Sequence, residues 1–191
     1  MQIMCKKELR KKFRQIRMDM SQTERENTEL KVLERVVATD AYKSADVILA
    51  YVSSYIEVDT YKLIEHSWQM GKKVCVPRCK PYSNDMEFFE INSFDDLEQG
   101  AFGIYEPKGH CTGWDNRGNT CCIVPALSYD KRGFRLGFGK GFYDKFLTGF
   151  NGVKLGICYE NCMSEQLPDD EYDISVDLIV TDKSTLKIKK C

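Results

Sequence analysis

Residues 120–150 read TCCIVPALSYDKRGFRLGFGKGFYDKFLTGF. The first third of this stretch is largely apolar and indicates a buried strand, and phenylalanines at 142, 146 and 150 recur at helical spacing. Between them lies a segment rich in glycine and basic residues. A strand followed by a helix is the unit from which α/β proteins with a parallel sheet are built. Ligands of such folds bind beyond the carboxyl ends of the strands, so residues 133–144 are the expected binding site.

The rest of the chain continues this alternation. Apolar runs indicate strands at residues 45–53, 72–77, 86–91, 153–159 and 176–182. Three helices are expected, the first with Leu9, Phe13, Ile16 and Met20, the second opened by the capping box SQTE at 21–24, and the third running from Asp59 or Thr60 to Gly71. Residues 94–119 are expected to be mostly irregular. We therefore predict one α/β domain over residues 1–191, with a mainly parallel sheet covered by helices on both faces.

The composition argues against several classes of protein. The 191 residues suit one domain, and 28 basic against 29 acidic residues give a formal net charge of −1. That balance provides no overall basic field for nucleic acid or an anionic membrane. The opening MQIMCKKELRKKFRQIR carries charges where a signal peptide has an apolar core, and no apolar run is long enough to span a bilayer. We expect a cytoplasmic monomer or weak homodimer that acts on small molecules and binds neither nucleic acid nor membrane.

The nine cysteines do not indicate a disulfide scaffold, and two spaced pairs among them do not indicate a zinc site. Their number is odd and the chain is not small, so we expect reduced thiols. Cys75 and Cys79 share a four-residue spacing with Cys158 and Cys162, but structural zinc sites favour the C-x2-C spacing and often use histidine. Buried thiols in strands are the better explanation of these pairs.

Residues 137–141 do not match the familiar phosphate-binding motifs. Lys140 is followed by Gly141 where a Walker A loop needs Ser or Thr, and Phe142 stands where a dinucleotide fingerprint or a kinase loop needs a third glycine. Peptide N–H groups free of side chains nevertheless form a concave anion nest, and Arg135 can grip two phosphate oxygens. A strained turn followed by Asp144 at a helix N-terminus explains the pattern equally well. From the residues alone both interpretations stay open.

Five segments, in order along the chain, resemble the 5-formyltetrahydrofolate cyclo-ligase family, also called 5,10-methenyltetrahydrofolate synthetases. They are KKELR (6–10), IEVDT (56–60), GKKVCVPR (71–78), GIYEP (103–107) and VPALSYDKRGFRLGFGKGFYDKFL (124–147). The resemblance implies an enzyme that uses ATP and Mg2+ to close 5-formyltetrahydrofolate to 5,10-methenyltetrahydrofolate. It also implies phosphorylation of the formyl oxygen and release of ADP and phosphate.

The resemblance further implies roles for individual residues. The implied catalytic residues are Arg135, Lys140 and Tyr143. The implied ATP ligands are Lys6, Arg10, Arg135, Leu136, Gly137, Phe138, Gly139, Lys140, Gly141, Phe142 and Tyr143. The implied folate ligands are Val52, Glu57, Phe138, Gly139, Lys140, Gly141 and Phe142. The implied Mg2+ ligands are Asp144 and Asp177, which suit an ion that takes hard oxygen ligands and commonly one or two carboxylates.

Each role has a plainer alternative. The seven basic residues from Lys6 to Arg17 also suit a solvated helix face, which we expect for Lys11, Lys12 and Arg17. For Lys6 and Arg10, four positions apart on one helical face, the resemblance favours ATP.

The acidic and aromatic candidates have alternatives too. Glu57 also suits an ordinary loop acid, Asp144 a helix-dipole partner, and Asp177 a strand-end acid facing solvent. The phenylalanines of residues 142–150 also suit the core. For the whole protein, an enzyme acting on a sugar phosphate and a non-catalytic nucleotide-binding module stay as rival classes, because the fold alone does not choose among chemistries.

Overall fold

The computed structural model describes residues 4–80, 82–100 and 103–189. Within them a seven-stranded sheet has the order β12-β11-β9-β6-β1-β2-β3. Its strands are β1 (Val47–Leu49), β2 (Lys73–Cys79), β3 (Met86–Ile91), β6 (Thr120–Val124), β9 (Val153–Ile157), β11 (Leu178–Val180) and β12 (Thr185–Lys187). The five central strands pair in parallel, and β3 and β12 pair antiparallel at the two edges. The predicted mainly parallel sheet is confirmed.

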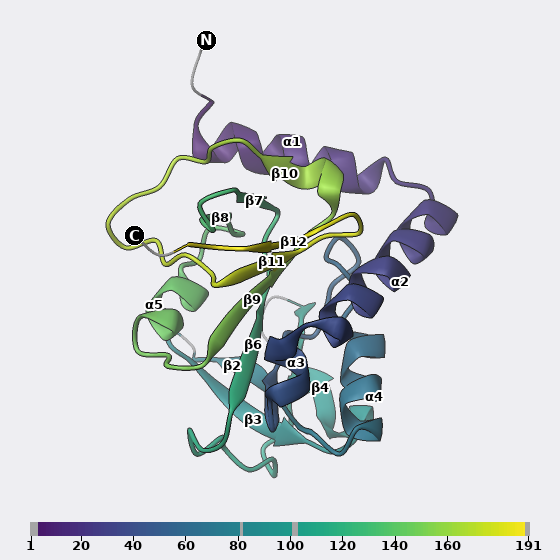
Figure 1. Cartoon of the computed structure of the whole chain (residues 1–191). Coiled ribbons are helices and arrows are strands. Elements are labelled where there is room, and N and C mark those ends of the chain that lie inside the picture. The colour runs from purple at the N-terminus through teal and green to yellow at the C-terminus, as the bar shows by residue number, and fades with distance from the viewer. Residues whose placement is uncertain (1–3, 81, 101–102, 190–191) are drawn as a thin grey trace.

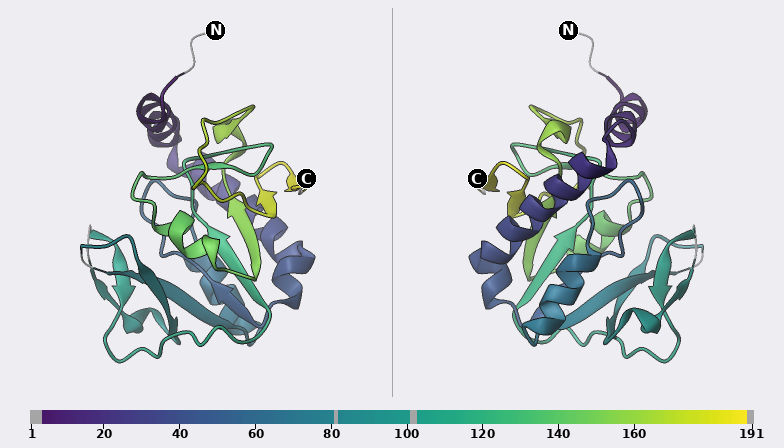
Figure 2. Two further views of the ribbon diagram at one scale, coloured as in Figure 1. Left: turned by 90° about the vertical axis from the view of Figure 1, so that its left-hand side faces the viewer. Right: turned by 90° about the vertical axis from the view of Figure 1, so that its right-hand side faces the viewer.

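Helices cover both faces of this sheet, as predicted (Figure 1). On one side lie α2 (Gln22–Ala38), α3 (Asp40–Ser44) and α4 (Tyr61–Gln69), and on the other lies α5 (Phe142–Thr148). The remaining helix, α1 (Lys6–Met18), lies across the end of the sheet, and the two side views in Figure 2 show it there as well. The chain therefore brings its first helix to the carboxyl ends of the parallel strands. This end of the sheet is called its carboxyl edge below.

Local sequence signals explain where these helices begin. The Ser21 hydroxyl accepts a hydrogen bond from the Glu24 N–H at 3.2 Å, so the predicted cap opens α2. The N-cap of α4 is Thr60, whose side chain makes no cap hydrogen bond, and the preceding Asp59 carboxylate accepts from the Tyr61 N–H at 3.2 Å instead. Phe13 on α1 is only 2% exposed, whereas Met18 at its end is 59% exposed. The apolar side chains of the central strands have no exposed surface at Ile48, Leu49, Ile123 and Leu155.

The segment 120–130 differs from its prediction as one strand. It forms β6 and then β7 (Ser128–Asp130), which leaves the main sheet. Pro125 follows the last residue of β6 and has no N–H to continue the ladder. β7 joins a separate three-stranded sheet with β8 (Arg135–Leu136) and β10 (Met163–Ser164). This small sheet carries the chain from the end of β6 to the glycine segment.

Residues 94–119 contain more regular structure than expected. A 3-10 helix, η1 (Phe94–Asp96), leads into a hairpin of β4 (Leu97–Gln99) and β5 (Tyr105–Pro107). After β5 the chain is irregular and runs beside β3, where the Glu90 N–H donates to Thr112 O at 2.8 Å. A further 3-10 helix, η3 (Glu160–Cys162), follows β9. None of the helices described combines the length and apolar character needed to cross a membrane.

The eight described cysteines all have free thiols, which confirms the expectation for these residues. Five of them are buried, at 75, 121, 122, 158 and 162. Burial raises the pKa of Cys75 to about 12, and it raises the pKa of Cys121 to about 12 as well. These groups are therefore neutral thiols that pack as small apolar side chains. Cys191 lies outside the described residues.

Candidate active site at the carboxyl edge of the sheet

Residues 137–141, called the glycine loop below, connect β8 to α5 and require glycine at two positions. Gly139 has a φ of +100° and Gly141 a φ of +72°, and Gly141 is the N-cap of α5. A side chain at 139 would place its Cβ 3.2 Å from the central carbon of the Arg10 guanidinium. Backbone conformation and close approach by α1 thus both account for these glycines.

Helix α1 closes over the glycine loop through Arg10. The Arg10 Nε atom donates to Gly137 O at 2.9 Å. One turn earlier, the Lys6 ammonium contacts Asp170 at 3.0 Å and Asp173 at 2.8 Å. Partial burial opposes the charge on Lys6, but hydrogen bonds to these two carboxylates raise its pKa. Arg10 and Lys6 are therefore half-buried and bonded to other segments of the protein, which a wholly solvated helix face would not require.

The predicted pair Arg135 and Asp144 forms one ion pair beneath the loop. Arg135 Nη2 donates to Asp144 Oδ1 at 2.6 Å, and Arg135 Nη1 donates to Ile174 O at 2.7 Å. The Ile174 N–H donates to the same Asp144 oxygen at 3.3 Å. The Arg135 side chain is 4% exposed and that of Asp144 is 27% exposed. Arg135 thus holds Asp144 in place, and Asp144 is the more exposed of the two side chains.

Asp177, the second predicted metal ligand, has a different cationic partner. It precedes β11, where its carboxylate accepts from the Lys154 N–H at 2.8 Å and lies 3.3 Å from the Lys154 ammonium. Burial raises the pKa of the Cys122 thiol, while the charges of Arg135 and Lys154 both oppose that shift. In the strand register Lys154 pairs with Cys122 of β6, and Asp177 stands just before the amino end of β11.

Glu57 and Tyr143 belong to different segments and share an environment. Burial raises the pKa of Glu57, although its carboxylate accepts hydrogen bonds from Ser54 N at 2.9 Å and Ser54 Oγ at 2.7 Å. Burial also raises the pKa of Tyr143 well above its ordinary value, with Cys122 and Glu57 adding to the shift. The Tyr143 hydroxyl is buried and has no hydrogen-bond partner in the structure as described. It is a donor without an acceptor in the described part of the chain.

The other predicted site residues lie on or next to the glycine loop. Lys140 is exposed, whereas Phe138 and Phe142 are half-buried against the core. Leu136 is 1% exposed and Val52 is 4% exposed, so their side chains lie in the core. Within the described residues, contacts join α1, the glycine loop and the start of α5, whereas Asp177 stands just before the amino end of β11.

A cavity of about 630 Å³ lies elsewhere, at the amino ends of β6 and β9. It is lined by aromatic rings, asparagines and the single cation of Lys145, and it contains no carboxylate. Trp114 stacks there on Phe146 and Phe150. The cavity lacks the paired charges found at the glycine loop, so we place the chemistry at the carboxyl edge.

The family model described as "5-formyltetrahydrofolate cyclo-ligase family" matches residues 2–182. This chain belongs to the 5-formyltetrahydrofolate cyclo-ligase family. The cyclo-ligase of Mus musculus is 28% identical over 94% of this chain and 95% of its own length. That of Escherichia coli K12 is 31% identical over 72% of this chain and 78% of its own. The structure of Aquifex aeolicus 5,10-methenyltetrahydrofolate synthetase is 33% identical with a TM-score of 0.84, covering 98% and 95% of the two chains.

Family membership confirms the predicted family, fold, enzyme class and reaction. The chain is a ligase of folate one-carbon metabolism. The rival classes, a sugar-phosphate enzyme and a non-catalytic nucleotide-binding module, are thereby set aside. The roles of the individual residues and the Mg2+ ligands stay predictions, because no comparison tests them.

The prediction for Arg17 is wrong. Instead of facing solvent it is 0% exposed, and its guanidinium donates to Ile56 O at 2.9 Å, Ala126 O at 2.5 Å and Leu127 O at 2.9 Å. Charge counting alone suggests a solvated face. Position 17 is one helical turn after the buried Phe13, however, and residues four apart lie on the same face of a helix. Arg17 therefore lies on the buried face of this cyclo-ligase helix.

Asp130 stabilises the turn before the glycine loop, and the sequence pattern did not single it out. It has no exposed surface, and its Oδ1 accepts from the N–H groups of Arg132 at 2.9 Å and Phe134 at 3.1 Å. Its Oδ2 accepts from the Leu167 N–H at 3.0 Å and from the Arg132 guanidinium. This carboxylate therefore folds the turn between β7 and β8 and so positions the chain that leads to Arg135 and the glycine loop.

Replacement of Gly139 by alanine should damage both the fold and ATP use. The φ of +100° disfavours an L-residue by about 1–2 kcal/mol, and the new Cβ would displace the Arg10 guanidinium. We expect a comparable loss of unfolding free energy in urea and a higher apparent KM for ATP. Gly149→Ala is the matched control, because Gly149 has a φ of −103° and open space around it. Wild-type stability and KM in Gly139→Ala would contradict the prediction.

Proposed function

We propose that this ligase binds ATP and 5-formyltetrahydrofolate at the carboxyl edge of the sheet and joins the formyl carbon to the neighbouring amine there. The observation that carries the assignment is the meeting of a backbone loop, an Arg10 cation above it and a buried Arg135–Asp144 pair below it. Phosphoryl transfer needs such positioning and neutralisation of charge more than it needs a covalent nucleophile. The family shared with known cyclo-ligases supports the same reaction.

The proposed reaction has two stages. A formamide oxygen is a poor leaving group, so transfer of the γ-phosphoryl group of ATP to the formyl oxygen first gives an imidate-like phosphate and ADP. The anilino nitrogen then attacks the formyl carbon, a carbon–nitrogen bond forms, and the carbon–oxygen bond breaks with release of inorganic phosphate. Both stages spread negative charge over phosphate oxygens, where preorganised N–H groups and cations stabilise it.

The glycine loop and α1 are the proposed ATP site. The peptide groups of residues 137–141 carry little side-chain bulk and can approach phosphate oxygens closely. In the described structure Arg10 donates to Gly137 O through Nε. Its Nη1 and Nη2 atoms could then bind phosphate oxygens. Lys140 adds charge from the loop itself. Lys6 would have to exchange Asp170 or Asp173 for ATP, so we assign it to the outer part of the site.

Asp144 and Asp177 are the proposed Mg2+ ligands. In the described part of the chain the side-chain contacts of Asp144 involve Oδ1, so Oδ2 is available to a cation. Asp177, just before the amino end of β11, would supply a second hard oxygen, directly or through water. This donor set of carboxylates without histidine or thiolate fits Mg2+. When bound, the ion would neutralise charge on the transferring phosphate.

Glu57 and Tyr143 are the proposed contacts to folate. Glu57 lies in the loop after β1 and Tyr143 in the first turn of α5, and burial raises the pKa of both groups. The Tyr143 hydroxyl needs an acceptor, and a formyl or pterin oxygen supplies one. Phe138 and Phe142 can pack against the flat ring. The predicted catalytic role of Tyr143 thus becomes hydrogen bonding to substrate in this proposal.

The direct test uses purified protein with 5-formyltetrahydrofolate, ATP and Mg2+. We expect the absorbance of 5,10-methenyltetrahydrofolate to rise in the complete mixture, with one ADP formed for each product molecule. Omission of ATP or Mg2+ should abolish the rise. Absence of product in the complete mixture, with protein that is folded by circular dichroism, would refute the proposed function.

Replacement of Asp144 by asparagine should separate metal binding from support of Arg135. We expect loss of most turnover, a higher apparent Mg2+ constant and partial recovery at high Mg2+, because an amide is a weaker ligand than a carboxylate. Some stability should be lost too, since the buried Arg135 guanidinium loses its counter-ion. Asp85→Asn is the control, because Asp85 pairs with Lys145 of the same helix at 2.6 Å.

Two outcomes of that experiment are decisive. A weaker Asp177→Asn effect of the same kind would support a shared ion. An Asp144→Asn variant that is slow but has the wild-type Mg2+ dependence would show that Asp144 only anchors Arg135, and the metal assignment would be withdrawn.

Replacement of Tyr143 by phenylalanine should slow the enzyme without destabilising it. A buried hydroxyl without a partner carries a desolvation penalty of about 1–3 kcal/mol, so its removal leaves the unfolding free energy equal or higher. We expect kcat/KM for folate to fall about tenfold, which equals roughly 1.4 kcal/mol of transition-state binding. In Tyr129→Phe, the control, a hydroxyl bonded to Val124 O at 2.8 Å is lost and stability should fall. Full activity in Tyr143→Phe would refute the proposed hydrogen bond from Tyr143 to the substrate.

A further inference from the structure

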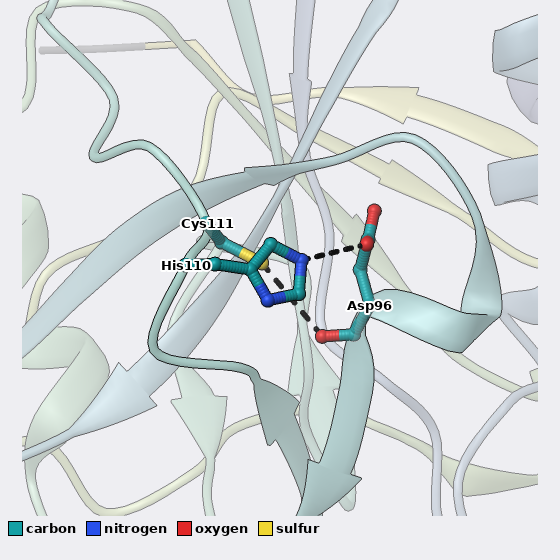
Figure 3. Close-up of side chains that lie close together, drawn as sticks. All are labelled: Asp96, His110 and Cys111. Carbon is teal, nitrogen blue, oxygen red and sulfur yellow. Dashed lines mark hydrogen bonds and ion pairs between the residues drawn. The ribbon is translucent and has the colours of Figure 1, made fainter.

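Three metal-binding side chains converge outside the proposed active site (Figure 3). Asp96 is the last residue of η1, and His110 and Cys111 lie in the irregular segment after β5. One carboxylate oxygen, one imidazole nitrogen and the thiol sulfur all lie within 4.8 Å of one another. Within the residues that the structure describes, no other three His, Cys, Asp or Glu side chains gather this closely.

We propose that Asp96, His110 and Cys111 bind a Zn2+ ion, with water as the fourth ligand. Zn2+ takes thiolate, imidazole and carboxylate ligands in a tetrahedral site, and a site with three protein ligands keeps one position open. Mg2+ and Ca2+ prefer oxygen ligands alone, so the nitrogen and sulfur donors select against them. The donor set is therefore chemically distinct from the two-aspartate set proposed for Mg2+.

The ligands are already close to the geometry that Zn2+ needs. Bond lengths of 2.0–2.3 Å in a tetrahedron separate neighbouring donor atoms by about 3.4–3.7 Å. The His110 Nε2 and Asp96 Oδ1 atoms are 3.0 Å apart, and the largest separation in the group is below 4.8 Å. Adjustments of about 1 Å, chiefly by the exposed His110 side chain, are enough to reach the tetrahedral spacing. His110 is 64% exposed, which gives an ion a path of entry and His110 the freedom to adjust.

Backbone hydrogen bonds hold the two ligand-bearing segments together. The Lys108 N–H donates to Asp96 O at 2.7 Å, and the Cys111 N–H donates to Lys108 O at 3.0 Å. The second carboxylate oxygen of Asp96 accepts from the N–H groups of Asn92 at 2.7 Å and Ser93 at 3.2 Å. These contacts orient Asp96 so that Oδ1 faces the histidine. Such outer contacts are what fixes the ligands in known metal sites.

A hydrogen bond holds the Cys111 thiol next to Asp96. Cys111 Sγ donates to Asp96 O at 3.7 Å, as Figure 3 shows. Arg78 is held by Pro107 O and contributes no metal ligand.

A bound ion would join the β4–β5 hairpin to the segment that borders the main sheet. Asp96 leads directly into β4, whereas Cys111 precedes Thr112, Gly113 and Trp114, which pair with β3. Zn2+ would thus stabilise one edge of the fold. No residue of the proposed ATP or folate site takes part, so the proposal and the catalytic assignment are independent.

The test titrates metal-free protein with Zn2+ in a calorimeter and with Co2+ in a spectrophotometer. We expect one Zn2+ for each chain and a sulfur-to-cobalt charge-transfer band in the near ultraviolet, together with a higher melting temperature when Zn2+ is present. Cys111→Ser should abolish the band. Cys111→Ser and His110→Ala should each weaken Zn2+ binding at least about tenfold, since even outer contacts of metal sites contribute 10–100-fold.

Matched variants control for other thiols and acids. Cys5→Ser removes an exposed thiol and Asp95→Asn an exposed neighbour of Asp96, and both should bind Zn2+ and Co2+ as the wild type does. Circular dichroism and the folate assay confirm that every variant folds. Equal Zn2+ affinity in wild type, Cys111→Ser and His110→Ala, or a cobalt band that survives in Cys111→Ser, would overturn the proposal. Absence of any Zn2+ binding by the wild type would overturn it as well.

Discussion

The buried guanidinium of Arg17 is the interaction on which the active edge of this fold depends. A cation taken out of water costs several kcal/mol unless its donors are satisfied. Arg17 has no exposed surface, and its terminal nitrogens donate to Ile56 O, Ala126 O and Leu127 O. The guanidinium also lies over the Tyr159 ring at 5.3 Å from the ring centre. Backbone carbonyls thus take the place of a carboxylate partner.

Those carbonyls belong to the segments that carry the proposed site. Ile56 precedes Glu57 in the loop after β1, and Ala126 and Leu127 lie where the chain passes from β6 to β7. The Leu127 N–H in turn donates to Leu136 O at 2.8 Å, next to Arg135. Because Arg17 is on α1, the same contacts seat the helix that brings Arg10 to the glycine loop. Loss of this one side chain would therefore loosen all parts of the site together.

Sequence patterns predicted the elements well wherever the signal is local. The run MEFFEI is strand β3 at Met86–Ile91, and the capping signal at Ser21 opens α2. The glycine loop and its flanking charges were found because they are contiguous in the chain. The partners Ile174 for Arg135 and Lys154 for Asp177 lie 39 and 23 residues away in the sequence, and no periodic pattern reports such contacts. The cluster of Asp96 with His110 and Cys111 forms only through the β4–β5 hairpin, in a segment predicted to be mostly irregular.

Two buried polar atoms without partners in the described structure have different meanings. Arg17 Nε is surrounded by core residues, and its guanidinium already has three carbonyl acceptors, so its unpaired donor is a cost of packing that the other contacts offset. Tyr143 Oη has no such compensation within its own side chain, and Tyr143 lies at the start of the helix that carries Asp144. Its hydroxyl is the only polar group of that side chain, so an acceptor on a ligand is what would satisfy it. This difference is the reason to assign function to the tyrosine and structure to the arginine.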